Sequence, residues 1–119
     1  MSRYEVLFYE TPGGKQPAKE FLLDLEPKMR AKMLRTIEMA GENGPELREP
    51  YSKALEDGIF ELRAKVGSDI SRVLYFFYVG ERIILTNGFI KKTQKTPERE
   101  KKLARKYKQD YLSREEEKT

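Results

Sequence analysis

The chain has 119 residues, a length that suits one domain with its own hydrophobic core. Its formal net charge is +4. Charged residues make up 37% of the sequence and aromatic residues 11%, a mixture that indicates a globular protein with a highly charged surface rather than a disordered chain. Because the sequence has no cysteine, it excludes a disulfide framework and a thiolate metal site, and it fits a reducing compartment.

The first half of the chain predicts one strand and two helices. Residues 4–10 (YEVLFYE) are rich in aromatic and β-branched side chains, which favours a strand. The N-terminal sequence has no apolar run long enough for a signal peptide or a membrane span, so we expect a cytoplasmic protein with no membrane partner. Pro17 favours the start of a short helix, and Pro27 ends that helix and opens the next one.

Apolar residues recur at helical spacing after each of these prolines. The first helix has one apolar face, made of Phe21, Leu22 and Leu25. The core side of the second helix is expected to carry Met29, Met33, Ile37 and Ala40, with Leu34 beside them. Gly41 and the turn residues 43–45 are expected to stop this helix.

The middle of the chain predicts a loop and three strands. Residues 46–57 show no clear period, and we assign them to a connecting loop. Residues 59–66 alternate between apolar and polar side chains, which is typical of a strand with one buried face. Residues 72–79 are almost continuously apolar and predict a central strand covered on both faces. Residues 83–92 form the last predicted strand, and short turns join the three.

The C-terminal part predicts one more helix. Thr96 is placed to cap it and Pro97 to be its first residue. Its buried face is expected to contain Leu103, Tyr107 and Tyr111, and residues 113–119 are expected to be a frayed tail. The order of elements is then β-α-α-β-β-β-α. We therefore predict a single α+β domain of residues 1–119, with a largely antiparallel sheet and helices packed on it.

The positive charge is concentrated in one segment. Residues 91–108 contain nine cations and two anions, a net charge of +7, and the rest of the chain has a net charge of −3. This asymmetry favours a polyanion or an acidic protein as a partner, although a solvated basic helix has the same pattern.

Charged residues are also predicted to gather on one part of the sheet. Glu61 and Arg63 lie on the polar face of the second strand, Arg72 begins the third, and Lys91 and Lys92 end the last one. An arginine fork can bind two phosphate oxygens at once, and lysines add point charge, so these residues form a candidate phosphate site. The alternative is an ordinary surface pair of Glu61 with Arg63, and an Arg72 head group that leaves the sheet at its edge.

At these residues the sequence resembles a known family. The stretch IFELRAKVGSDISRVLYFFYVGERIILTNGFIKKTQKTP, residues 59–97, is similar to the RelE/HigB toxin superfamily of bacterial toxin–antitoxin pairs, and within it to the phage-derived HigB-like branch. Three features carry the resemblance: an arginine after Glu-Leu, a strand that begins Arg-Val-Leu-Tyr, and the finish Gly-Phe-x-Lys-Lys-Thr-x-Lys-Thr-Pro. The resemblance implies a RelE-like fold with the order of elements given above.

It also implies a function. Toxins of this kind bind the small ribosomal subunit at the decoding site and cut the mRNA there without a metal or cofactor. A partner antitoxin, a helix-turn-helix protein of the HigA type in this branch, neutralises them. The resemblance implies that Arg72 contacts the scissile phosphate and matches Arg63 to a basic position of the family. Lys91 and Lys92 lie where relatives have catalytic or RNA-binding cations, and we take all four residues as catalytic candidates. We expect contacts to RNA or the ribosome from four cations of the basic segment: Lys95, Lys101, Lys102 and Arg105.

The chemistry requires positioning, charge stabilisation and a general base. A 2′-hydroxyl of RNA attacks the adjacent phosphate, and arginines stabilise the added negative charge. Because the chain has no histidine, the base is expected to be Glu61, a lysine that loses its proton, or a tyrosine such as Tyr75 or Tyr78. Glu61 is preferred because it is ionised at neutral pH. Two other functions stay open: a non-cleaving toxin of the same fold that binds DNA gyrase, and an inactive phage-derived adaptor.

Overall fold

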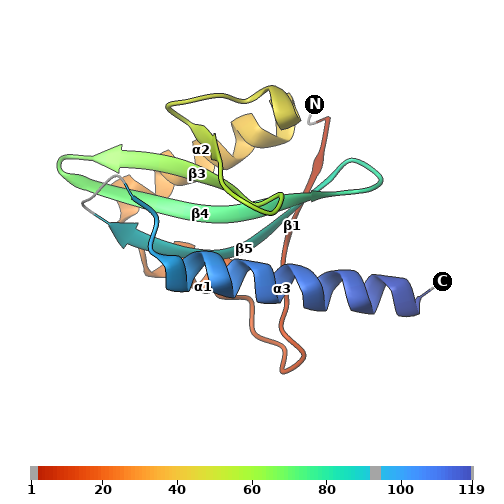
Figure 1. Ribbon diagram of the computed structural model, residues 1–119. Coiled ribbons are helices and arrows are strands. Elements are labelled where there is room, and N and C mark those ends of the chain that lie inside the picture. Colours follow the sequence, from red (N-terminus) through yellow and green to blue (C-terminus); the bar gives the residue numbers. More distant parts are fainter. Residues whose placement is uncertain (1–2, 92–94, 119) are drawn as a thin grey trace.

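The computed structural model describes residues 3–91 and 95–118 and has an α+β fold, as predicted (Figure 1). Its elements in chain order are β1 (Glu5–Phe8), α1 (Pro17–Asp24), α2 (Pro27–Asn43), the 3-10 helix η1 (Gly44–Glu46), β2 (Ser52–Ala54), β3 (Phe60–Val66), β4 (Asp69–Tyr78), β5 (Arg82–Lys91) and α3 (Glu98–Glu117). The strands form one sheet in the order β1-β5-β4-β3-β2. Strands β2 to β5 are antiparallel neighbours, and β1 runs parallel to β5.

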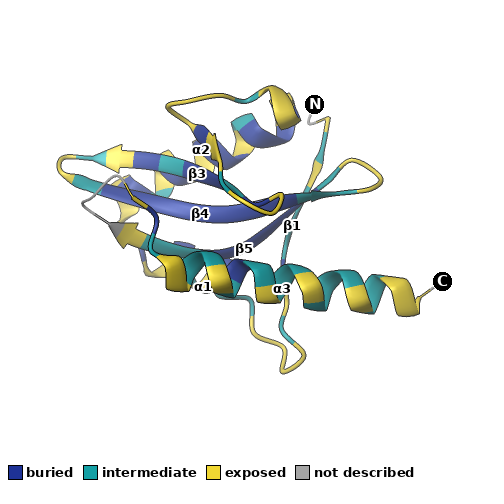
Figure 2. Ribbon diagram, viewed as in Figure 1, coloured by how far each residue is buried: buried dark blue, intermediate teal, exposed yellow. Residues whose placement is uncertain are grey.

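The sheet lies between two layers of helix. Helices α1 and α2 pack against one face, and α3 crosses the other (Figure 1). Strand β4, in the middle of the sheet, is buried along most of its length (Figure 2). This confirms the prediction of a central strand covered on both faces. No helix among the described residues combines the length and the apolar content needed to cross a membrane.

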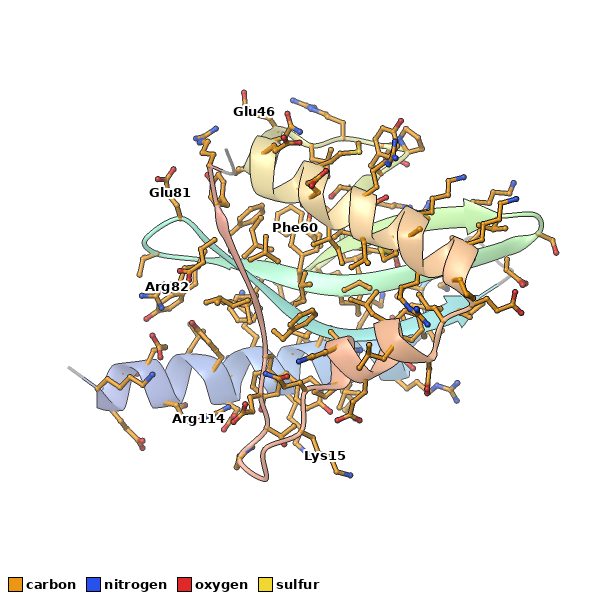
Figure 3. All side chains as sticks on the ribbon, turned by 180° about the vertical axis from the view of Figure 1, so that it is seen from behind. Lys15, Glu46, Phe60, Glu81, Arg82 and Arg114 are labelled. Atoms are coloured by element: carbon orange, nitrogen blue, oxygen red, sulfur yellow. The ribbon has the colours of Figure 1, made fainter. Side chains whose placement is uncertain are left out.

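The two faces of the sheet have apolar cores of different size. The larger core lies under α1 and α2, and its fully buried members include Met33, Leu62, Val73, Ile83 and Leu85. Figure 3 shows Phe60 between α2 and the sheet, where it packs against this core. The smaller core lies under α3 and contains Tyr9, Ile59, Leu74, Phe76, Ile84 and Ala104. The face under α3 therefore has more room for polar side chains.

Both helix-opening prolines are confirmed, and two details of α2 differ from the prediction. Pro17 and Pro27 lie in the first turns of α1 and α2. Helix α2 continues through Gly41 and ends at Asn43. The cap residue after it, Gly44, has a φ of 55° and leaves space that the ring of Tyr4 occupies. Leu34 was expected beside the core but is 47% exposed, because it lies about 100° around the helix from Met33.

The segment 46–57, predicted to be a loop, begins with the last residue of η1 and contains the edge strand β2. Residues Ser52–Ala54 pair with Phe60–Leu62, the first three residues of β3. Three residues are too few to show an alternating pattern, so periodicity could not identify this strand. The remainder of β3 extends past β2.

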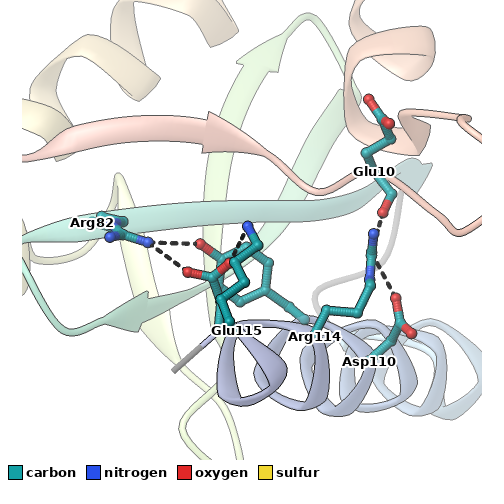
Figure 4. Close-up of polar contacts among 7 residues, drawn as sticks. Glu10, Arg82, Asp110, Arg114 and Glu115 are labelled. Carbon is teal, nitrogen blue, oxygen red and sulfur yellow. Dashed lines mark hydrogen bonds and ion pairs between the residues drawn. The ribbon is translucent and has the colours of Figure 1, made fainter.

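Helix α3 continues to Glu117, through most of the stretch expected to be a frayed tail. Its last turns are held to the sheet side of the molecule by polar contacts (Figure 4). Arg82 donates to the Tyr111 hydroxyl and to Glu115, over 3.2 and 3.0 Å, and Arg114 donates to the carbonyl oxygen of Glu10. These contacts stabilise the helical conformation of the charged C-terminal residues.

The start of α3 is tied to a bulge in β5. The pairing of β4 with β5 passes from Val73 opposite Gly88 to Tyr75 opposite Leu85, so two residues of β5 face one of β4. One of these two residues of β5, Asn87, donates its side-chain amide to the carbonyl and to the carboxylate of Glu100, over 3.2 and 3.1 Å. The bulge therefore fixes the first turn of α3 above β4 and β5.

Candidate functional site

Three of the predicted site residues come together on the α3 side of the sheet. Arg63 in β3 lies directly opposite Arg72 in β4, and Glu61 lies two residues from Arg63 on the same face. The Arg63 Nε donates to Glu61 Oε2 over 2.6 Å. The Arg72 Nη1 is 3.7 Å from Glu61 Oε1. One carboxylate therefore lies between two guanidinium groups, as the antiparallel pairing of these strands predicts.

This cluster is buried, which neither sequence interpretation anticipated. Glu61 and Arg72 are both 0% exposed, and the side chain of Arg63 is 14% exposed. The Glu61–Arg63 pair is therefore not an ordinary surface pair, and the Arg72 head group does not leave the sheet at its edge. Charged groups are costly to bury unless they are paired, and the mutual pairing of these three offsets part of that cost.

The groups around Arg72 shift the pKa of its guanidinium in opposite directions. Burial lowers the pKa of the Arg72 guanidinium from its usual value; the carboxylate of Glu61 raises this pKa, and the charge of Arg63 lowers it further. The ring centroid of Phe89, in β5, lies 6.0 Å from the guanidinium carbon of Arg72. The guanidinium therefore lies between a carboxylate and an aromatic face.

A fourth member of the cluster was assigned a different role by the sequence. Thr96 was expected to cap α3, and Pro97 to be the first helical residue, but Pro97 is the cap and α3 begins at Glu98. The Thr96 side chain is buried, and its hydroxyl donates to Glu61 Oε1. Because Glu61 offers a charged acceptor close by, Thr96 bonds to it instead of to the helix end. Thr96 thus covers the cluster from the segment that leads into α3.

The remaining catalytic candidates are only partly described. Lys91 is the last residue of β5, and its backbone pairs with Ile70; its side chain lies outside the described residues. Lys92 lies outside them altogether. Their catalytic assignment stays a prediction.

The predicted RNA-binding cations differ in their surroundings. Lys95 and Lys102 are exposed. The Nζ of Lys101 lies 2.6 Å from Glu56 and 2.8 Å from Glu98, and Arg105 lies 3.5 Å from Asp57. Two of the four cations are therefore already close to carboxylates of the β2–β3 connection or of the first turn of α3.

The two tyrosines considered as general bases, Tyr75 and Tyr78, do not belong to this cluster. Tyr75 is buried on the α1/α2 side, and its hydroxyl forms a 2.6 Å hydrogen bond with Ser52. Burial raises its pKa, and the bond to Ser52 lowers it. Tyr78 packs edge-to-face against Tyr111 of α3. Tyr75 therefore cannot act on a ligand at Glu61, because the sheet separates them.

The cluster can hold a phosphate only where the ligand reaches its arginines. Two guanidinium groups on adjacent strands suit binding of two phosphate oxygens, and the carboxylate between them suits acceptance of a proton. Arg63 is the partly exposed member, whereas Glu61 and Arg72 are fully buried and the Thr96 hydroxyl is bonded to Glu61. Among the described residues there is no group of three or more carboxylates arranged to hold a metal ion.

Comparison with known proteins identifies the family of the chain. No curated protein matches the sequence. The family model described as "Phage derived protein Gp49-like (DUF891)" matches residues 20–109, which include the second part of α1, all of α2, strands β2 to β5 and the first part of α3. The chain therefore belongs to the Gp49-like family, a RelE-like toxin family associated with toxin–antitoxin pairs.

Proposed function

We propose that the chain is the toxin of a toxin–antitoxin pair and that it cleaves mRNA on the ribosome. The cluster of Glu61, Arg63 and Arg72 is the observation that supports this activity, because it brings two cations and one carboxylate to one place on the sheet. Its partner is a helix-turn-helix antitoxin of the HigA type. The RelE-like character of the family supports the toxin assignment.

In the proposed reaction the 2′-hydroxyl of one nucleotide attacks the phosphate on its 3′ side. The new O–P bond forms as the bond to the 5′ oxygen of the next nucleotide breaks, which leaves a cyclic phosphate and a 5′-hydroxyl. Glu61 accepts the proton of the attacking hydroxyl, and Arg63 and Arg72 stabilise the charge on the phosphate. The leaving 5′ oxygen takes a proton from Lys91 or Lys92, the catalytic lysines that the resemblance implies, and becomes the 5′-hydroxyl.

Access to this site requires a change at Thr96. Its hydroxyl occupies the Glu61 oxygen that lies nearer to Arg72, so a phosphate reaches Arg72 only when Thr96 moves away. Binding to the ribosome or the mRNA supplies the free energy for that movement. The free protein is therefore expected to be a poor nuclease, and ribosomes programmed with mRNA are the relevant substrate.

The test is expression of the chain alone in a bacterial host. We expect growth and translation to stop, and we expect new mRNA fragments with 5′-hydroxyl ends to appear within coding regions. The control is the same gene with an early stop codon, which separates effects of the protein from those of its transcript. Normal growth with folded protein present would rule out the toxin assignment.

The burial of the cluster favours one alternative, a toxin of the same fold that acts by binding without cleavage. A sealed Glu61–Arg72 pair can be purely structural, which would leave the basic surface to contact a protein such as DNA gyrase. The same expression experiment separates the two functions. Arrested growth without 5′-hydroxyl mRNA ends would support the binding toxin.

A further inference from the structure

An open cavity of about 260 Å³ lies at the part of β3 that extends past β2. Helix α2 forms one wall, through Lys32, and the chain at Pro50 and Tyr51 forms another. The lining residues include three cations, Lys32, Arg63 and Lys65, and no carboxylate. The rest of the lining is mostly apolar. The cavity thus combines positive charge with a surface suited to an uncharged flat group.

The edge of β3 explains why the cavity is there. Strand β2 covers only the first three residues of β3, and the Arg63 amide makes one further bond to the Tyr51 carbonyl over 2.9 Å. Beyond that point the Lys32 ammonium donates to the carbonyl of Lys65 over 2.6 Å. This contact occupies an acceptor that an added strand would need, and lysines at a sheet edge discourage strand pairing. An extended peptide is therefore a poor occupant.

A nucleotide fits the same features better. Tyr51 is 44% exposed and offers an aromatic surface, and Pro50 and Ile70 add apolar contact area. Single-stranded RNA is bound by aromatic rings that stack on its bases and by cations that contact its phosphates. We propose that this cavity binds one nucleotide of single-stranded RNA, with its base against Tyr51 and its phosphate at Arg63 and Lys65.

Arg63 connects this cavity to the cluster described above. It lines the cavity, and its Nε bonds to Glu61. The bound nucleotide is therefore a neighbour of the one whose phosphate reaches Arg72, and the cavity contributes to the choice of sequence around the cleaved bond. This inference rests on the proposed function, because it takes the cleaved RNA as the ligand.

Binding can be measured separately from cleavage. The probe is a fluorescein-labelled hexanucleotide of 2′-O-methyl RNA, which lacks the attacking hydroxyl, and its affinity is measured by fluorescence anisotropy. We expect Tyr51→Ala to weaken binding about 5- to 150-fold, the effect of removing one stacking aromatic, and Tyr51→Phe to bind like the wild type. Lys65→Ala should weaken binding and reduce the salt dependence by about one phosphate contact.

The matched control is Lys19→Ala, which removes one exposed lysine on α1 and should leave the affinity within about twofold of the wild type. Wild-type affinity in Tyr51→Ala, or equal losses in Tyr51→Phe and Tyr51→Ala, would overturn the proposal. The proposal would also be overturned if a fluorescein-labelled acidic peptide bound in a way that depends on Tyr51, and RNA binding did not depend on Tyr51. If Tyr51-dependent RNA binding is present but programmed ribosomes are not cleaved, the cavity assignment stands and the nuclease assignment is lost.

Discussion

The two faces of the sheet are built from different chemistry. Under α1 and α2 the buried side chains are mostly apolar and include no charged group among the described residues, and they come from helices as well as strands. Under α3 the apolar core is smaller, and Glu61, Arg72 and Asn87 are buried beside it. Helix α3 itself has one fully buried residue among those described, Ala104, and it is attached through hydrogen bonds and ion pairs as well as aromatic contacts.

The difference indicates that the two faces of the sheet contribute differently to stability and to the candidate site. Apolar burial supplies most of the free energy of folding, so the α1/α2 face holds the sheet in shape. Buried charges add little net stability. Under the proposed function, Glu61 and Arg72 are buried under α3 because they take part in catalysis. We therefore expect substitutions in the core under α1 and α2 to cause the largest losses of stability. Substitutions under α3 should cost less stability and should also change activity or the attachment of α3.

The largest expected effect on stability comes from Met33→Ala on the α1/α2 face. Met33 is fully buried between α2 and the sheet, and the truncation should lower the free energy of unfolding by about 2–5 kcal/mol. Urea denaturation followed by circular dichroism measures this change. The cleavage rate per folded molecule should stay at the wild-type value; a slower rate would show that the two faces are not independent.

Thr96→Val tests the contact that covers the polar cluster. The change removes a hydroxyl that donates to the buried Glu61 carboxylate, and it should cost about 1.5–3 kcal/mol of stability. Thr96→Ser keeps the donor and is the matched control. If unfolding in urea gives the same free energy for Thr96→Val and Thr96→Ser, Thr96 contributes only its apolar contacts.

Tyr9→Phe tests the attachment of α3. The Tyr9 hydroxyl donates to Asp110 over 2.6 Å, and its loss should cost about 1.5 kcal/mol, at the low end for a charged acceptor because Asp110 is partly exposed. Burial, with help from Asp110, raises the pKa of Tyr9 from 10.0 to about 12.

This pKa gives the Tyr9 contact a defined pH dependence. Because the folded state holds the Tyr9 proton more tightly than the unfolded state, the contribution is complete below pH 10 and is lost as the pH rises toward 12. Tyr9→Phe should lack this part of the alkaline loss of stability. Parallel stability curves of the wild type and Tyr9→Phe from pH 9 to 11.5 would contradict the assignment.

The smallest expected effects concern the exposed cations. Lys102→Ala should weaken ribosome binding and reduce its salt dependence by about one contact, because Lys102 is exposed on α3. Lys101→Ala should change the salt dependence less, because that ammonium lies between Glu56 and Glu98. Binding measured across a range of salt concentrations distinguishes the two. A larger decrease in salt dependence for Lys101→Ala than for Lys102→Ala would mean that Lys101 leaves Glu56 and Glu98 when the ribosome binds.

The sequence predicted the fold where side-chain pattern and backbone signals agree. The alternation in β3, the apolar run of β4 and the prolines that open α1 and α2 are local features, and each element was found at its expected place. Strand β2 was missed because its pairing depends on β3 and not on its own three residues. The end of α3 was missed because its contacts, to Glu10 and Arg82, come from distant parts of the chain.

The candidate site was predictable in its members but not in its environment. Adjacent strands bring Glu61, Arg63 and Arg72 together, and that pairing follows from short turns. Their burial depends on how α3 and Thr96 cover the sheet, and the sequence patterns of β3 and β4 do not predict this. The position of Thr96 in the sequence did not predict its contact with Glu61, because a threonine before a proline at the start of a helix is explained equally well by capping.

The most direct test of the account is single-turnover mRNA cleavage on programmed ribosomes by Arg72→Lys. Lysine keeps a cation beside the buried Glu61, so the fold should survive, whereas Arg72→Ala would leave that carboxylate with less compensating charge. The control is Arg35→Lys, an exposed arginine on α2. Since an ammonium cannot reproduce the fork, we expect Arg72→Lys to cleave about 10²–10³-fold more slowly than the wild type, and Arg35→Lys to cleave normally. A folded Arg72→Lys protein that cleaves at the wild-type rate would contradict the account.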